Sequence, residues 1–200
     1  MRKFVYLISP SKINESFYLK LEKVLSFGNT AFFQLRLKKS SKKSILQIAK
    51  RIKKITKKYK VKFILNDDHI LALKANADGC HLGQGDGLLK IVRKKMKKKI
   101  LGVTCHNSKI FAIKAVQAKA NYLAFGSFYK SKLKPKAIRA KINTLKWAYK
   151  NIKKPIVVIG GINNKNYKKL IKLGAKYIAI SSFIWDNPKL KPKFAIKKFK

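Results

Sequence analysis

The stretch "AKANYLAF" (118–125) shows the pattern that decides the fold, because a helix ends there, a small or turn residue follows, and a strand begins. The same order recurs at "GNTAFFQ" (28–34), "ANADGCHL" (75–82) and "LGAKYIAI" (173–180). Asp78 lies in one of these turns, and we expect it to act as a turn residue. The repeat predicts a chain of successive strand and helix units.

Eight short β-rich runs are spaced along the whole chain, and most of them are continuously apolar. They are "FVYLIS" (4–9), "AFFQLR" (31–36), "KFILND" (62–67), "GCHLG" (79–83), "ILGVTC" (100–105), "YLAFGS" (122–127), "IVVIGG" (156–161) and "YIAISS" (177–182). Continuous apolar runs are typical of parallel strands that are buried on both faces. Helical patterns lie between them, for example at 16–27, 109–119 and 164–174. Eight alternating units predict an α/β protein of the (β/α)₈ TIM-barrel class.

The composition suits one barrel domain over residues 1–200. A hydrophobic fraction of 46% is ordinary for a globular chain and supplies a sizeable core. No linker or low-complexity segment interrupts the pattern. The last stretch, 183–200, is expected to form a short loop and a closing helix.

The chain is extremely basic, with 50 Lys+Arg against seven Asp+Glu and a formal net charge of +43. Such a charge suggests nucleic acid or an anionic membrane as a partner. The Lys residues, however, are spread at helix-face spacing, as in 48–60 and 88–99. Lys also outnumbers Arg, whereas specific recognition of phosphates and bases favours Arg. We therefore expect a solvated basic surface that attracts small phosphates and diphosphates, with no specific nucleic-acid partner and no membrane partner.

Cys80 and Cys105 are the two cysteines, and two free thiols suit a reducing compartment. The apolar run near the N-terminus is too short for a signal peptide, and no stretch approaches the roughly 18 apolar residues of a membrane helix. These features predict a cytoplasmic protein.

Polar residues gather where the predicted strands end, which is where TIM barrels carry their chemistry. They are Gln34, Arg36 and Lys38 after the second strand, Asn66, Asp67 and Asp68 after the third, Gln84 and Asp86 after the fourth, Thr104, Cys105, His106 and Asn107 at the fifth, "GSFYKSKLKP" (126–135) after the sixth, "GGIN" (160–163) after the seventh, and Ser181 and Ser182 after the eighth.

Four of the seven acids fall within residues 66–86. Asp67 and Asp86 follow adjacent strands and can face one point, where two carboxylates, water and substrate phosphate oxygens would suit Mg²⁺. The alternative is a pair of helix caps or surface acids. We expect Asp67 and Asp86 to be the metal ligands and Asp68 to cap a helix that starts near His69.

The "GGIN" turn is expected to open the next helix and to offer backbone N–H groups to an anion, together with Ser181 and Ser182. His106 could be a general base or a metal ligand, but a structural role is favoured, as it is for His69 and His81. Cys105 is expected to be a packing residue.

Taken in order, seven blocks of the sequence resemble the thiamine phosphate synthases. The blocks are "QLRLK" (34–38), "ILND" (64–67), "ADGCHLGQGD" (77–86), "GVTCHNS" (102–108), "YLAFGSFYKSKLK" (122–134), "VVIGGI" (157–162) and "YIAISS" (177–182). The resemblance covers nearly the whole chain. It implies a transferase that joins a hydroxymethylpyrimidine diphosphate to a thiazole phosphate, giving thiamine phosphate and diphosphate.

The resemblance also implies a role for each matching position. The pyrimidine substrate and its diphosphate would be bound by Gln34, Arg36, Lys38, Asn66, Thr104 and Lys134; Mg²⁺ by Asp67 and Asp86; and the thiazole phosphate by Ser131, Lys132, Leu133, Gly161, Ser181 and Ser182. Departure of diphosphate from a benzylic-type carbon needs charge stabilisation and no strong base. Mg²⁺, Arg36, Lys38 and Lys134 would supply it as the catalytic groups, which agrees with the lack of a nucleophile–base pair in the sequence.

The sixth loop departs from the family pattern Gly-Pro-x-x-Pro-Thr-x-Thr-Lys. Here it reads "GSFYKSKLK", without either proline, and Leu133 cannot donate a hydroxyl hydrogen bond. Lys130 and Lys132 could compensate. The related thiazole tautomerases share the fold, but they bind no diphosphate. That alternative is disfavoured by the retention of Arg36, Lys38, Asp67, Asp86 and Lys134. A basic nucleic-acid-binding protein is a third hypothesis, and both a monomer and a homodimer remain open.

Overall fold

The computed structural model describes residues 2–130 and 138–200, and in them eight parallel strands close into a barrel in chain order. The strands are β1 (Val5–Ile8), β2 (Thr30–Leu35), β3 (Lys62–Asn66), β4 (Gly79–Leu82), β5 (Ile100–His106), β6 (Tyr122–Gly126), β7 (Ile156–Ile159) and β8 (Tyr177–Ile180). Each lies within two residues of its predicted place. The barrel closes where β1 pairs with β8, and the predicted TIM barrel is confirmed.

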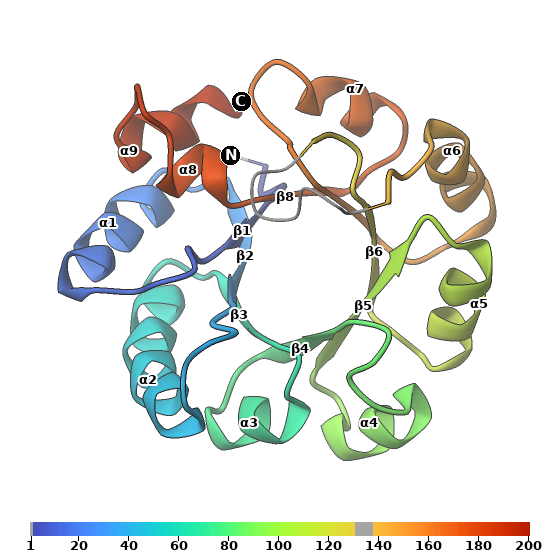
Figure 1. Cartoon of the computed structure of the whole chain (residues 1–200), viewed down its shortest axis with the longest axis horizontal. Helices are drawn as coiled ribbons and strands as arrows, with labels where there is room; N and C mark the ends of the chain where they lie inside the picture. The colour runs from blue at the N-terminus through green and yellow to red at the C-terminus, as the bar shows by residue number, and fades with distance from the viewer. Residues whose placement is uncertain (1, 131–137) are drawn as a thin grey trace.

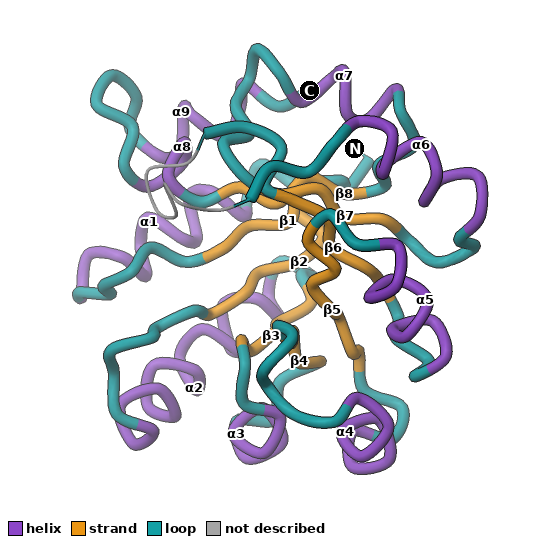
Figure 2. The backbone as a smooth tube through the Cα atoms, turned by 45° about the vertical axis from the view of Figure 1, so that its right-hand side comes forward, coloured by secondary structure: helices purple, strands orange, loops and turns teal. Residues whose placement is uncertain are grey.

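Helices surround the barrel as an outer ring (Figure 1), and the strands run through its centre (Figure 2). The helices are α1 (Glu15–Leu25), α2 (Lys42–Lys58), α3 (His69–Lys74), α4 (Leu89–Met96), α5 (Lys109–Gln117), α6 (Ile142–Asn151), α7 (Tyr167–Lys172), α8 (Ser182–Trp185) and α9 (Pro192–Ala195), followed by a 3₁₀ turn, η1 (Ile196–Lys198). Four helices begin at a side-chain cap, formed by Asn14, Ser41, Asp68 and Ser108. The predicted cap role of Asp68 is confirmed, since its carboxylate accepts from the Leu71 N–H at 2.8 Å.

The closing segment differs from the short loop and one closing helix expected over 183–200. It forms the two short helices α8 and α9, because Pro188 lies between them and Pro192 occupies the first turn of α9. A proline has no N–H to continue a helix but fits its first turn. The Asn187 side chain accepts from the backbone of the residues that follow α8 and stabilises the turn.

Two apolar layers hold the barrel. One fills the space between strands and helices and includes Phe33 and Val103. The other fills the lumen, where Tyr6, Ile64 and Tyr122 pack together. Gly102 is required in this lumen because a Cβ there would overlap the ring of Tyr122.

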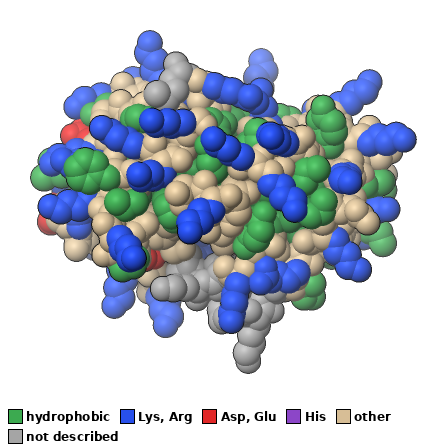
Figure 3. Space-filling model, turned by 90° about the horizontal axis from the view of Figure 1, so that it is seen from above, with side chains coloured by type: hydrophobic (Ala, Val, Ile, Leu, Met, Phe, Trp, Pro, Cys, Tyr) green, Lys and Arg blue, Asp and Glu red, His purple; other side chains and the backbone are tan. Residues whose placement is uncertain are grey.

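The basic residues do not form one stripe on the face that Figure 3 shows. Lys and Arg side chains are scattered singly over the face shown in Figure 3, between apolar and neutral polar groups. None of the helices in the described residues is both long and apolar enough to span a membrane.

Candidate functional site

The barrel places ten of the predicted site residues at the carboxyl ends of its strands. They are Gln34, Arg36 and Lys38 at β2; Asn66 and Asp67 at β3; Asp86 after β4; Thr104 in β5; Gly161 after β7; and Ser181 and Ser182 after β8. The remaining four, Ser131, Lys132, Leu133 and Lys134, lie outside the described residues. Residues far apart in the sequence therefore share one mouth of the barrel.

Asp67 and Asp86 contact each other at this mouth. Asp67 directly follows β3 with a φ of 66°, and its N–H donates to the His81 carbonyl at 2.8 Å. The Asp86 carboxylate accepts from the Gly83 N–H at 2.6 Å. Burial raises the pKa of the Asp67 carboxyl, and a hydrogen bond to Asp86 and repulsion from it raise that pKa further. The arrangement brings two half-buried acidic groups together at the mouth.

The contact between Asp67 and Asp86 does not arise from a shortage of Lys and Arg side chains. Four of the seven acids form ion pairs with Lys or Arg, namely Asp68 with Lys42, Glu15 with Arg51, Asp78 with Lys53, and Glu22 with Lys58. Two carboxylates that face each other fit a divalent cation, which would remove their repulsion. Within residues 2–130 and 138–200, no group of three or more His, Cys, Asp or Glu side chains could hold a metal.

Arg36 and Lys38 supply positive charge beside this pair. Both are close enough to lower the pKa of Asp67 and so oppose the effect of burial. Arg36 is half-buried, and its N–H donates to the Ser9 hydroxyl at 3.0 Å, which holds the backbone after β2 in place. An anion at the mouth would therefore meet fixed positive charge.

A chain of hydrogen bonds lies in the lumen beneath the mouth. The Gln34 amide Nε2 donates to the Tyr6 hydroxyl at 3.0 Å, and the Tyr6 and Tyr122 hydroxyls are 2.7 Å apart. The Tyr122 hydroxyl lies 2.9 Å from His81 Nδ1, and His81 Nε2 lies 2.8 Å from Thr104 Oγ1. Burial raises the pKa of both tyrosines, which keeps them protonated. Two predicted site residues are thus joined through groups on other strands.

Sequence reasoning missed Tyr6 and Tyr122 as site residues. Each is the single tyrosine of an otherwise non-polar strand. A buried tyrosine usually finds a hydrogen-bond partner for its hydroxyl, and this was the signal available. His81 was expected to be structural, and it fills that role within this chain.

The turn after β7 is built from two glycines in the left-handed region, with φ values of 104° at Gly160 and 62° at Gly161. A Cβ at Gly160 would overlap the side chain of Ser127, and one at Gly161 would overlap the Lys130 carbonyl. The sixth loop packs on the turn, since the Tyr129 N–H donates to the Gly160 carbonyl at 3.0 Å. The glycines allow this close approach.

The expectation that "GGIN" opens the next helix was wrong. Helix α7 begins at Tyr167, after a further turn at residues 164–166. The Asn163 side chain accepts from the N–H groups of Lys165 and Asn166 and so stabilises this extra turn. The glycine turn and the N-terminus of α7 are therefore separate features of the chain.

The two serines after β8 differ in their surroundings. The Ser181 hydroxyl donates to the Ser9 carbonyl at 3.1 Å, which connects the ends of β8 and β1. Ser182 is half-buried and begins α8. Ser181 therefore already has an internal partner.

The described parts of the sixth loop are anchored by hydrogen bonds where the family pattern has proline. The Ser127 N–H donates to the Ile138 carbonyl at 3.3 Å, a bond that proline cannot make. Arg139 Nη1 donates to the Phe128 carbonyl at 3.1 Å. These contacts tie both ends of the loop together beside the glycine turn.

The predicted packing role of Cys105 is confirmed. The residue is fully buried, and burial raises the pKa of its thiol to about 12, so that it is not a thiolate at neutral pH. Asp78 lies in the predicted turn, but its carboxylate does more than terminate a helix. It accepts from the Phe63 N–H at 2.7 Å and pairs with Lys53 at 2.7 Å.

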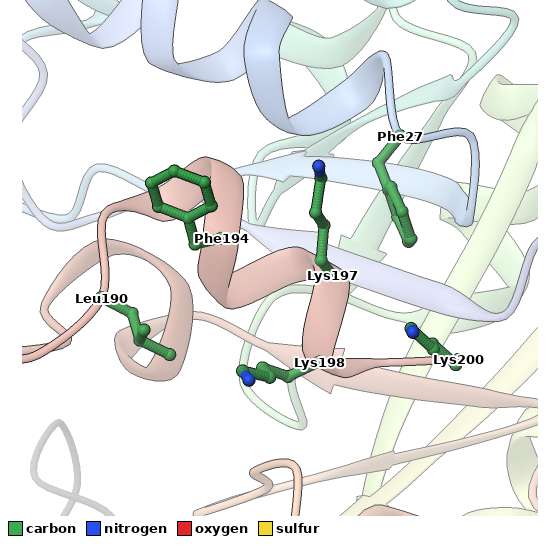
Figure 4. Close-up of a pocket in the computed structure, with 6 residues that line it drawn as sticks. All are labelled: Phe27, Leu190, Phe194, Lys197, Lys198 and Lys200. Atoms are coloured by element: carbon green, nitrogen blue, oxygen red, sulfur yellow. The ribbon is translucent and has the colours of Figure 1, made fainter.

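A surface hollow of about 610 Å³ lies away from this mouth (Figure 4). Its lining combines apolar and Lys side chains and includes Phe27, Phe194 and Lys197. Phe27 precedes β2, so this part of the hollow lies at the amino-terminal end of the strands. The hollow contains no acid and none of the predicted site residues.

Comparisons with known proteins agree with this geometry. The family profile described as "Thiamine monophosphate synthase" matches residues 5–184. The thiamine-phosphate synthase of Pelagibacter ubique is 54% identical over 200 residues, which cover 100% of this chain and 97% of the relative. The thiamine-phosphate synthase of Erythrobacter litoralis is 37% identical over 188 residues, which cover 92% of this chain and 88% of the relative.

A solved structure shows the same architecture. Thiamine phosphate pyrophosphorylase from Pyrococcus furiosus superposes with a TM-score of 0.86 at 25% sequence identity. The superposition covers 98% of this chain and 92% of the other. The likeness therefore extends over the whole barrel.

Proposed function

Because the chain belongs to the thiamine monophosphate synthase family, we propose that it condenses 4-amino-5-hydroxymethyl-2-methylpyrimidine diphosphate with thiazole phosphate. The products are thiamine phosphate and diphosphate. The observation that carries this proposal is the contact between Asp67 and Asp86 beside Arg36 and Lys38. This arrangement suits a diphosphate together with a divalent cation.

The leaving diphosphate is stabilised by charge. Asp67 and Asp86 would hold Mg²⁺, which supplies positive charge to the diphosphate oxygens when bound. Arg36 and Lys38 approach the same group from β2, and Lys134 is proposed to reach it from the sixth loop. Fixed charges of this kind stabilise the negative charge that develops as the bond to carbon breaks.

The pyrimidine is proposed to bind above the lumen, against Gln34 and Asn66, with Thr104 beside the carbon that carries the diphosphate. Gln34 is buried, and its amide is oriented by Tyr6. A fixed amide distinguishes donors from acceptors on a ring edge and orients the reacting carbon. The pyrimidine therefore lies between the leaving group and the floor of the site.

The thiazole phosphate is proposed to bind at the glycine turn. Gly161 would contribute backbone contacts, and Ser182 a hydroxyl, while Ser131, Lys132 and Leu133 would line the same phosphate. Ser181 would act mainly through its backbone, because its hydroxyl donates to Ser9. Anchoring the phosphate aligns the thiazole nitrogen with the carbon that loses diphosphate, and the nitrogen lone pair forms the new bond.

No protein base is required in this sequence of events. The nitrogen carries no proton to remove, and the buried Cys105 thiol is not ionised at neutral pH. A tautomerase has no use for a diphosphate site. The clustered charges of Asp67, Asp86, Arg36 and Lys38 thus favour the transferase.

The proposed partners are small phosphate and diphosphate substrates, in a single domain that spans residues 1–200. The scattered basic residues in Figure 3 support weak, sequence-independent attraction of polyanions over specific nucleic-acid recognition. The free, buried Cys80 and Cys105 suit the cytoplasm.

The first test is formation of thiamine phosphate from the two substrates, with Mg²⁺ and then with EDTA. We expect product with Mg²⁺ and its loss with EDTA. Asp86→Asn should lower kcat about 100-fold or more, because one charged ligand is removed. Asp186→Asn, which removes an acid outside the site, serves as the control. No product at high substrate concentration, or full activity of Asp86→Asn, would contradict the proposal.

A further inference from the structure

The lumen chain joins the two residues proposed to contact the pyrimidine substrate from opposite ends. Gln34 lies on β2 and Thr104 on β5, and the groups between them come from β1, β6 and β4. The Tyr122 ring stacks on His81 with centroids 5.7 Å apart and planes 12° apart. This stacking, together with the space left by Gly102, fixes the Tyr122 ring across the lumen.

The direction of the hydrogen bonds follows from which groups can donate. The Gln34 amide nitrogen has no lone pair to offer, so it donates to Tyr6. Within the part of the chain that the structure describes, the other partner of the Tyr6 hydroxyl is Tyr122, which must therefore receive the Tyr6 proton. Any other order would leave a buried hydroxyl proton without an acceptor, and such a loss is costly.

The remaining bonds then have one consistent order. Tyr122 donates to His81 Nδ1, so that nitrogen carries no proton. The proton of the neutral imidazole is on Nε2, which donates to Thr104 Oγ1. The Thr104 oxygen therefore accepts from His81, and its own O–H donates to a group outside this chain of hydrogen bonds.

We propose that Tyr6, Tyr122 and His81 are positioning residues that hold His81 as the Nε2–H tautomer and aim the Thr104 hydroxyl proton at the leaving diphosphate. A donor oriented in advance stabilises developing negative charge without reorganising at the moment of reaction. This inference rests on the proposed function, because an oriented Thr104 matters for rate only if a diphosphate substrate reaches it.

Nuclear magnetic resonance tests the direction of the chain without any substrate. The protein contains three histidines, so long-range ¹H–¹⁵N correlations of the imidazoles can be assigned with His69→Gln, His81→Gln and His106→Gln variants. We expect the Nε2–H tautomer for His81, and a changed Nδ1 signal in Tyr122→Phe. An Nδ1–H tautomer in the wild-type protein would overturn the proposed order of donors, whatever the activity.

Kinetics test the effect on the reaction. Tyr122→Phe should lower kcat about ten-fold, the equivalent of one lost oriented hydrogen bond, and leave KM for thiazole phosphate unchanged. Thr104→Val should lower kcat to a similar extent, and the double variant should be no worse than Thr104→Val alone. Tyr177→Phe is the matched control, because Tyr177 lies at the opposite end of the lumen, at the start of β8.

Conservative replacements of His81 give a second kinetic readout. The amide nitrogen of Gln occupies the place of Nε2 and can still donate to Thr104, whereas that of Asn occupies the place of Nδ1. We therefore expect His81→Gln to retain more of kcat than His81→Asn. Additive effects of Tyr122→Phe and Thr104→Val, or equal loss in both His81 variants, would overturn the positioning role. Failure of the wild-type protein to form product would instead contradict the proposed function, and the tautomer would remain measurable.

Discussion

Asp67 and Asp86 contact each other although 50 basic side chains are available to pair with acids. A Lys or Arg in the place of either residue could attract a phosphate but could not ligate a cation. The contact also has a cost, since burial and repulsion both disfavour the charged form of Asp67. A site that would bind a metal therefore destabilises the metal-free barrel.

This cost predicts a pH-dependent effect of Asp67→Asn on stability. Because the folded protein raises the pKa of Asp67, its contribution to stability is full below the unfolded pKa and is lost as pH rises through the folded pKa. In EDTA at neutral pH, Asp67→Asn should thus have a higher Tm than the wild-type protein. The difference should shrink toward about pH 4, where the carboxyl is increasingly protonated in both states. Thermal unfolding monitored by circular dichroism measures it, and an unchanged or lower Tm at neutral pH would contradict the argument.

At the scale of elements, hydrogen bonds and ion pairs join neighbouring strand–helix units. These contacts, called joints below, hold the strand ends in place at the barrel mouth. Asp78 precedes β4, yet its carboxylate bonds to the backbone of β3 and to Lys53 of α2. Ser127 and Arg139 close the base of the sixth loop against the turn after β7. Both joints connect elements that lie side by side in the barrel.

Asp78→Ala should lower the free energy of unfolding by about 1–3 kcal/mol, because it leaves the Phe63 N–H and the Lys53 ammonium without their acceptor. Chemical denaturation with urea measures the change. Glu15→Ala, which breaks an exposed ion pair with Arg51, is the control and should change stability little. An equal loss of unfolding free energy in the two variants would contradict a larger contribution from the Asp78 contacts than from an exposed ion pair.

Arg139→Ala should raise KM for thiazole phosphate by roughly three- to ten-fold, since it removes the bond that holds the Phe128 carbonyl near the glycine turn. KM for the pyrimidine diphosphate should rise less, because that substrate is proposed to bind mainly on β2, β3 and β5, with Lys134 as its one contact from the sixth loop. Steady-state kinetics with each substrate varied in turn separates the two. Arg51→Ala removes an exposed arginine from α2 and controls for loss of charge. A parallel rise in both KM values would argue against a local effect.

For the whole molecule, the net charge of +43 opposes the compact state through self-repulsion. The described structure disperses its basic residues over the surface, as Figure 3 shows for one face, which limits repulsion between close neighbours. The same field attracts small polyanions, including substrates of the kind proposed here. Stability and substrate capture therefore respond to ionic strength together.

Added NaCl should raise the Tm of the metal-free protein, because the Debye length falls from about 30 Å at 0.01 M to about 3 Å at 1 M. Differential scanning calorimetry across this range measures the effect. A neutral osmolyte at matched osmolarity separates screening from preferential exclusion. A Tm that does not change with salt would mean that the dispersed charges repel one another too weakly to affect folding.

The sequence by itself determined where the strands lie, that they form a barrel, and which carboxylates meet at its mouth. Apolar runs and turn residues act locally, and parallel strands necessarily bring their carboxyl ends to one edge, so Asp67 and Asp86 could be predicted as neighbours. The cap at Asp68 is equally local. The break between α8 and α9 could have been anticipated from Pro188 and Pro192.

Only the tertiary structure decided what fills the lumen and how the turns connect to it. The Tyr6 and Tyr122 hydroxyls meet across 116 positions of sequence, and they do so because barrel closure and strand stagger set the height of each side chain. The start of α7 depends likewise on the Asn163 side chain. Local patterns specify the elements, whereas contacts between side chains of non-adjacent strands exist only once the barrel has closed.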